Sequence, residues 1–164
     1  METMEAIAAR RSVRSFEATP VPRETVERIV DAGRLAPTGV NVQPWHFVAV
    51  TAGETRRALA GLATRGGFIA DAPLCVAVFC AETNYWLEDG CAATANIILA
   101  ATAHGLGSCW VAGEKKPYAR DVARLLGAPA GRRLVALGAI GRAKGAAAPV
   151  PKKPLSEVLH WERF

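Results

Sequence analysis

Three arginines and a serine occur within five residues near the N-terminus, in the segment Arg10 to Arg14 (RRSVR). The planar guanidinium group suits phosphate oxygens, and a hydrogen bond to a charged group contributes roughly 1.5–3 kcal/mol. The segment also ends a helix expected over residues 4–11, with Met4, Ile7 and Ala8 on one face. Cations at a helix C-terminus complement the helix dipole by about 0.3–1 kcal/mol each. From the pattern alone, the cluster is either an anion site or a helix cap.

A polar loop follows the second expected helix, in the segment Ala36 to Phe47 (APTGVNVQPWHF). Thr38, Asn41 and Gln43 supply hydrogen-bond donors and acceptors, and two aromatic residues at the end of the segment supply flat apolar surface. Such a loop can bind the edge of a heteroaromatic ring, and the alternative is an ordinary turn into a strand. His46 is either a proton donor or, as we expect, a structural histidine satisfied by its surroundings.

A third basic step, Lys152-Lys153, stands between two prolines near the C-terminus and is, taken alone, typical of a solvated surface. The four cysteines, at positions 75, 80, 91 and 109, form no C-x-x-C pair and have no histidine at zinc-like spacing. Since free cysteine is among the most buried residue types, we expect buried, reduced thiols and no metal site.

The charge balance points to an anionic partner. Twenty Lys and Arg face 15 Asp and Glu, and the net charge of +5 suits a phosphate, a nucleic acid or a membrane surface. The basic residues are scattered among acidic ones, whereas nucleic-acid binding calls for a basic stripe with exposed aromatics. No run approaches 18 apolar residues, and the first 14 residues lack the apolar region of a secretory signal. We therefore expect a cytoplasmic protein that binds neither nucleic acid nor membrane.

The length and the expected elements fit one layered domain over residues 1–164. With 51% hydrophobic and 21% charged residues, the chain has the composition of a folded domain. Helices are expected over 4–11, 22–36, 54–63, 88–103 and 118–126, and strands over 46–51, 74–80, 108–112 and 134–140. The helix over 88–103 is small and apolar nearly all round, which places it in a domain centre or a subunit interface. The tail carries Trp161 and Phe164, so it should dock on something, such as another subunit.

Four segments together resemble the nitroreductase family of FMN-dependent oxidoreductases. In chain order they are RRSVRSF (10–16), APTGVNVQPWHF (36–47), GLGSCWV (105–111) and KKPLSEVLHWERF (152–164). The resemblance covers nearly the whole chain. It implies an α+β, three-layer α/β/α fold with a mixed central sheet of four or five strands flanked by helices. It also implies an interlocked homodimer with C-terminal tail exchange and two FMN molecules at the subunit interface.

The resemblance assigns cofactor contacts to positions of this chain. The FMN phosphate, ribityl chain and pyrimidine edge would contact Arg10, Arg11, Ser12 and Arg14, and Lys152 and Lys153 would return to the phosphate. The residues that flank the flavin from the partner subunit would be Pro37, Thr38, Gly39, Asn41 and Gln43. Ala112 and Gly113 would lie by the ring. No side chain would be catalytic, because the chemistry takes place at flavin N5.

The activity that the resemblance implies is a ping-pong reaction. NADH or NADPH would deliver a hydride to flavin N5, and a small electron-poor acceptor, such as a nitroaromatic, quinone or enone, would then take the electrons. The cofactor carries such chemistry while the protein positions it. Alternatives are a reductive dehalogenase or flavin-degrading enzyme of the same fold, and a non-catalytic flavin-binding protein. The chain is short for the family, so its pocket should be open, or closed by Tyr85 and Trp86.

Overall fold

The computed structural model describes all residues from Met1 to Phe164. The helices are α1 (Thr3–Ala9), α2 (Arg23–Arg34), α3 (Gly53–Leu62), α4 (Trp86–Ala103) and α5 (Ala119–Leu125). The strands are β1 (Trp45–Val50), β2 (Leu74–Ala81), β3 (Gly107–Ala112) and β4 (Arg132–Gly141). Three short 3-10 helices are η1 (Gly39–Asn41), η2 (Gly67–Ala70) and η3 (Leu155–Glu157). Every helix and strand expected from the sequence is present, with ends shifted by at most two residues.

The four strands form one sheet in the order β1-β2-β4-β3, and every neighbouring pair is antiparallel. The expectation of a mixed sheet is therefore wrong for these strands. The crossover through α4 does make β2 and β3 run in the same direction, but β4 lies between them and runs opposite to both. The one parallel pairing at the sheet is an isolated bridge between Ser12 and Ser108, beside β3.

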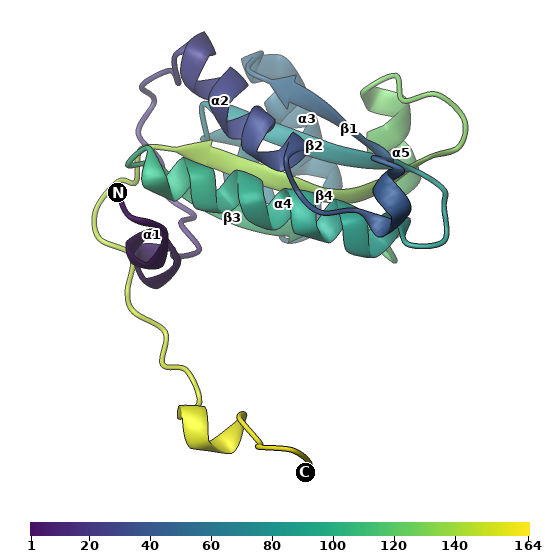
Figure 1. Ribbon diagram of the computed structural model, residues 1–164. Coiled ribbons are helices and arrows are strands. Elements are labelled where there is room, and N and C mark those ends of the chain that lie inside the picture. The colour runs from purple at the N-terminus through teal and green to yellow at the C-terminus, as the bar shows by residue number, and fades with distance from the viewer.

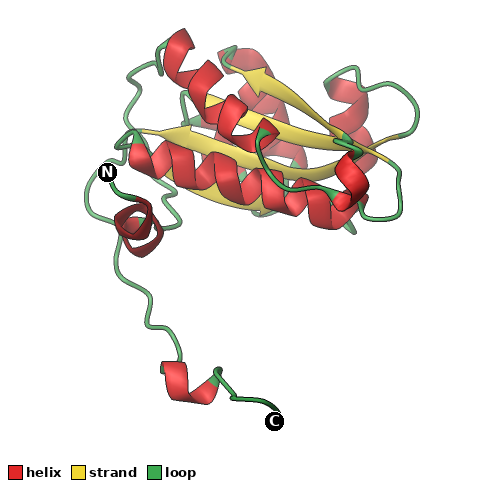
Figure 2. Cartoon of the chain, in the orientation of Figure 1, coloured by secondary structure: helices red, strands yellow, loops and turns green.

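Helices cover both faces of the sheet, as Figures 1 and 2 show. One core lies between the sheet and the pair α2 and α4, and includes Ile29 and Ile97. The other lies between the sheet and the pair α3 and α5, and includes Leu59 and Val122. Seven of the eight residues of β2 are buried because both faces are covered. The three-layer α/β/α architecture is confirmed.

A bulge in β4 lets α4 approach the sheet closely. Val78 pairs with Ala136 and Phe79 with Leu134, so Val135 is an extra residue in the ladder. A Cβ on Gly90 of α4 would lie 2.5 Å from a methyl carbon of Val135. Only glycine fits at this contact, which seats the first turns of α4 directly on the sheet.

Two apolar segments lack cover within the single chain. In α1, Met4 and Ile7 are 73% and 49% exposed, so the apolar face that they share points outward. The expected docking of the tail does not occur on its own chain: residues 148–164 are all exposed, and Figure 1 shows them running away from the body. The outer side of α4 is half-buried at Cys91, Ala95 and Leu99, so its burial is complete only toward the sheet.

None of the helices combines the length and the apolar composition that crossing a bilayer requires.

Candidate functional site

A basic pocket of about 830 Å³ lies where the N-terminal segment meets the chain after β4. Its five basic lining residues are Arg10, Arg11, Arg14, Lys144 and Lys152, and none of its lining residues is acidic. None of these five forms a salt bridge elsewhere. The pocket therefore presents uncompensated positive charge to any anion that enters it. Convergence of the two ends of the chain was expected only from the family resemblance.

Backbone hydrogen bonds hold the pocket together. The N–H of Val13 donates to the carbonyl of Ser108 at 2.9 Å, which fixes the arginine segment along the start of β3. The N–H of Lys144 donates to the carbonyl of Ser15 at 2.9 Å, which fixes the other wall. Val13 and Phe16 are buried in the core. Arg14 and Ser15, which lie between them, are exposed and are thus presented from a segment that is anchored on both sides.

Arg11 caps the helix that precedes the cluster. Its Nη1 donates to the carbonyl of Ala8 at 2.6 Å and to that of Arg10 at 2.9 Å. The capping role left open by the sequence is therefore real for this arginine. The charges of Arg14 and Arg10 are felt by the Cys109 thiol instead. Burial raises the pKa of this thiol, and the two guanidinium groups oppose the rise. They are the members of the cluster best placed to bind an anion.

Lys144 lines the pocket although sequence analysis did not select it. It stands in a stretch rich in Gly, Ala and Pro, and no neighbouring residue sets it apart. Only its backbone pairing with the N-terminal segment places it in the pocket. Lys152 reaches the pocket as expected, whereas Lys153 is not among the lining residues.

The loop from Pro37 to Gln43 lies at the other end of α4. The N–H of Gly39 donates to Oδ1 of Asp89 in the first turn of that helix, at 3.0 Å. The basic pocket adjoins the start of β3, which follows the last turn of α4. The helix rises about 20 Å between Asp89 and Ala103. No loop residue lines the basic pocket, so one chain does not bring these two parts of the predicted site together.

The loop has a constrained conformation. Val40, Asn41 and Gln43 have φ values of 47°, 58° and 52°, in the left-handed region. The N–H of Gln43 donates to Oγ1 of Thr38 at 3.2 Å, and its Nε2 donates to Oδ1 of Asn41 at 3.0 Å. The three polar side chains predicted to face a ligand therefore hydrogen-bond within the loop, while Asn41 and Gln43 remain exposed.

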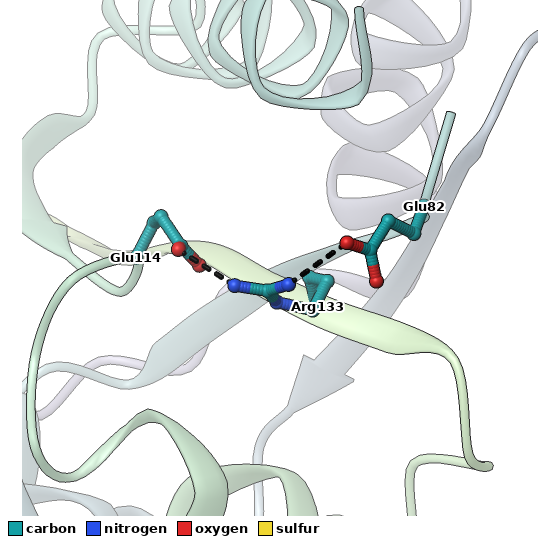
Figure 3. Close-up of polar contacts among 3 residues, drawn as sticks. All are labelled: Glu82, Glu114 and Arg133. Atoms are coloured by element: carbon teal, nitrogen blue, oxygen red, sulfur yellow. Dashed lines mark hydrogen bonds and ion pairs between the residues drawn. The ribbon is translucent and has the colours of Figure 1, made fainter. Parts of the chain in front are cut away.

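The Ala112-Gly113 step ends β3, and the residue after it is held in an ion-pair cluster. Glu114 accepts a hydrogen bond from Nη2 of Arg133 at 2.8 Å, and Glu82 accepts one from Nη1 at 3.1 Å (Figure 3). The same guanidinium lies 5.1 Å from the ring centroid of Trp86, the first residue of α4. This cluster was not predicted, because its members are distant in sequence and belong to no motif.

A second hollow, of about 620 Å³, lies between α2 and the outer strand β1. Its lining includes Gln43, Trp45, His46 and Phe47. His46 is exposed and its side chain forms no hydrogen bond, so the expectation of a satisfied structural histidine does not hold. The outer backbone edge of β1 has no partner strand within the chain.

The cysteines are unpaired, and three of the four are buried. Burial raises the pKa of Cys75 and of Cys80 to about 12, so both thiols stay neutral near pH 7. The expectation of buried, reduced thiols is confirmed for these residues and Cys109. Cys91, on the outer side of α4, is only half-buried.

Comparison with known proteins now places this geometry in a family. Residues 7–89 and 63–142 match the model of the nitroreductase family, which together is most of the chain. The chain belongs to the nitroreductase family. The resemblance seen in the sequence is thereby confirmed, and three of its four segments lie within the matched residues.

Two relatives illustrate the extent of the match. A Methanothermobacter thermautotrophicus protein is 35% identical over 115 residues, which cover 67% of this nitroreductase-family chain and 60% of the relative. The chain thus spans less than two thirds of that relative. The NADPH-flavin oxidoreductase of Vibrio harveyi is 27% identical over an alignment of 180 positions. The alignment covers 99% of this chain and 74% of that protein.

Solved structures match over nearly the whole chain. A crystal structure from Parabacteroides distasonis superposes with a TM-score of 0.93 at 26% identity, covering 99% of this chain and 98% of the other. The NADPH:FMN oxidoreductase of Vibrio harveyi, solved with NAD+, gives a TM-score of 0.86 at 25% identity, covering 99% of this chain and 77% of the other. The α+β nitroreductase fold expected for residues 1–164 is confirmed by these superpositions.

Proposed function

We propose that this protein is an FMN-dependent oxidoreductase that passes a hydride from NADH or NADPH to a small electron-poor acceptor, such as a nitroaromatic, a quinone or an enone. The observation that carries the proposal is the basic pocket, in which five cations face one space without a carboxylate. The named relatives agree with it, because the Vibrio harveyi protein is an NADPH:FMN oxidoreductase.

The shape of the region suits FMN, which is an elongated molecule with a dianionic phosphate at one end. The basic pocket adjoins Ser108 at the start of β3, and the Ala112-Gly113 step ends the same strand. Five residues of antiparallel strand span about 17 Å. A cofactor lying along this edge of the sheet would place its phosphate among the arginines and its ring beside Gly113.

Each group of residues would then have a separate task. Arg10, Arg14, Lys144 and Lys152 would neutralise the phosphate, and Ser12 would donate a hydrogen bond to it. Ala112, which is exposed, would border the ring. When bound, FMN supplies the hydride-transfer chemistry, and the protein holds its ring where a donor or an acceptor can reach it.

We further propose that two copies of residues 1–164, each a single domain, form a homodimer with the flavin at their interface and with exchanged tails. Three surfaces that are incompletely covered support this arrangement: the outer side of α4, the Pro37–Gln43 loop with Val40 92% exposed, and the tail with Trp161 79% exposed. The loop and the basic pocket lie at opposite ends of α4. A partner subunit can bring its loop to a pocket that the chain's own loop does not line.

A reducing compartment suits the four unpaired cysteines, so we place the protein in the cytoplasm.

The deciding experiment is cofactor binding. Purified protein should be yellow and hold about one FMN per chain, and anaerobic NADH or NADPH should bleach the flavin. A colourless protein that gains no bound flavin when FMN is added would refute the proposal. A flavoprotein that neither donor bleaches would instead be a flavin binder, and the oxidoreductase activity would be wrong.

A further inference from the structure

A buried carboxylate on α4 is the only connection by hydrogen bond between the Pro37–Gln43 loop and the rest of the chain. Oδ1 of Asp89 accepts the N–H of Gly39 at 3.0 Å across 50 positions of sequence. All other hydrogen bonds of Thr38, Asn41 and Gln43 stay within the loop. A single side chain therefore accepts the only hydrogen bond from this loop to the rest of the fold.

Asp89 is buried more deeply than accepting one backbone hydrogen bond requires. The residue is 5% exposed, and its Oδ2 is buried without any hydrogen-bond partner. A buried ionised group is costly unless it is well paired, and an amide or hydroxyl would accept the Gly39 N–H at lower cost. What a carboxylate adds is strength, because a charge-assisted hydrogen bond is about twice as strong as a neutral one.

The loop needs a strong anchor because its conformation is unfavourable. Positive φ is rare for residues other than glycine and is most costly for β-branched residues, yet Val40 has φ 47° and ψ 29°. Asn41 follows with φ 58° and Gln43 with φ 52°. Such conformations persist where the surrounding structure enforces them, and they cluster at ligand-binding segments.

Packing reinforces the anchor at the same point. A Cβ on Gly39 would lie 2.5 Å from Cδ2 of the Tyr85 ring, so the loop backbone rests directly against the residue that precedes α4. The bulge residue Val135 in turn contacts Gly90, next to Asp89. The contact between Gly90 and Val135 thus seats the helix turn that carries Asp89 on the sheet. The hydrogen bond from Gly39 then joins the loop to this turn.

We propose that Asp89 is a positioning residue of the flavin site, which keeps the Pro37–Gln43 loop in the conformation that meets FMN. This inference rests on the proposed function. Asp89 itself would not contact the cofactor. It acts through Gly39, and it lowers the cost of ordering the loop when FMN binds.

The test uses the full-length holoprotein with Asp89→Ala and Asp89→Asn. Release of FMN on dilution, followed by flavin fluorescence, should accelerate about tenfold in Asp89→Ala. Asparagine keeps an acceptor oxygen of the same shape, so Asp89→Asn should accelerate release only about threefold. Hydrogen exchange at the Gly39 amide should quicken in the same order.

Asn96→Ala is the matched control. Asn96 lies seven residues further along α4, and its Nδ2 donates to the carbonyl of Ala32 at 3.0 Å. It therefore also ties α4 to a distant backbone group, but away from the loop. This variant should lower the melting temperature while leaving FMN release and Gly39 exchange within about twofold of wild type.

The anchor role would be overturned if Asp89→Asn left both readouts unchanged, or if Asn96→Ala altered them equally. The asparagine variant decides the question even where alanine prevents folding. A wild-type protein that binds no FMN would refute the proposed function. Exchange at Gly39 requires no flavin, so unchanged exchange in the Asp89 variants would refute the anchor by itself.

Discussion

The guanidinium of Arg133 lies 5.1 Å from the ring centroid of Trp86 while it pairs with carboxylates on two other segments. The contact joins the second residue of β4 to the first residue of α4. Glu114 extends it to the turn that follows β3 (Figure 3). Glu114 retains only 18% side-chain exposure, so its pair is better shielded than the pair with Glu82 at 60%. One arginine thus organises the strand ends beside the Ala112-Gly113 step.

Replacing this arginine should destabilise the protein measurably. Arg133→Ala should lower the free energy of unfolding by about 1–2 kcal/mol, since it removes a cation–π contact and a partly shielded ion pair. Urea denaturation measures the change. Arg132→Ala is the matched control, because Arg132 precedes Arg133 on β4 and forms no salt bridge. Equal losses of stability in both variants would contradict the cluster's role.

Charge removal in the basic pocket should weaken FMN binding. Arg14→Ala and Lys144→Ala should each raise the FMN dissociation constant about tenfold, because each removes a charge-assisted interaction with the phosphate. Fluorescence titration measures the constant. Arg23→Ala removes the same charge from α2, where Arg23 pairs with Glu27, and should have little effect.

The same series ranks the two C-terminal lysines. Lys152 lines the pocket and Lys153 does not, so Lys153→Ala should weaken FMN binding less than Lys152→Ala. The reverse order would show that the tail takes a different course once the flavin is bound.

Loss of the aromatic tail should reduce self-association. Trp161→Ser combined with Phe164→Ser removes two side chains that are 79% and 105% exposed in the single chain. Sedimentation equilibrium should then show a shift from dimer toward monomer. Leu125→Ser, at a residue of α5 that is 41% exposed, is the control and should leave the dimer intact. A double variant that remains as dimeric as wild type would contradict tail exchange.

Alkaline pH should destabilise the protein through its buried thiols. The pKa of Cys75 is about 12 in the folded chain against an ordinary value of 9.0, because burial disfavours the thiolate. The unfolded chain therefore releases this proton first, and the stability contributed by the neutral thiol is present below pH 9 and is lost as pH rises toward 12. The slope is about 1.4 kcal/mol per pH unit for one thiol.

Cys75→Ala provides the check, with unfolding free energies measured by denaturant between pH 8 and pH 11. The variant should be less stable than wild type at pH 8, but its stability should fall less steeply above pH 9. Parallel curves for the two proteins would show that this thiol does not titrate as burial implies.

Local patterns were enough to predict every α-helix and strand in order. The continuous apolar run of β2 and the uniform small residues of α4 were sufficient because periodicity and composition act over a few residues. Strand directions could not be read in this way. Whether β4 is inserted between β2 and β3 depends on pairing between segments that are far apart in the chain.

The candidate site likewise has features that short sequence patterns predict and contacts that they do not. The arginine cluster, the polar loop and the lysine step were visible as residue types at short spacing. The place of Lys144 in the basic pocket, the hydrogen bond from Gly39 to Asp89 and the three-way contact of Arg133 were not. By itself the sequence determined which residues carry charge, polarity and turn propensity. Only the tertiary structure decided which of them meet, because such contacts arise from the packing of whole elements against one sheet.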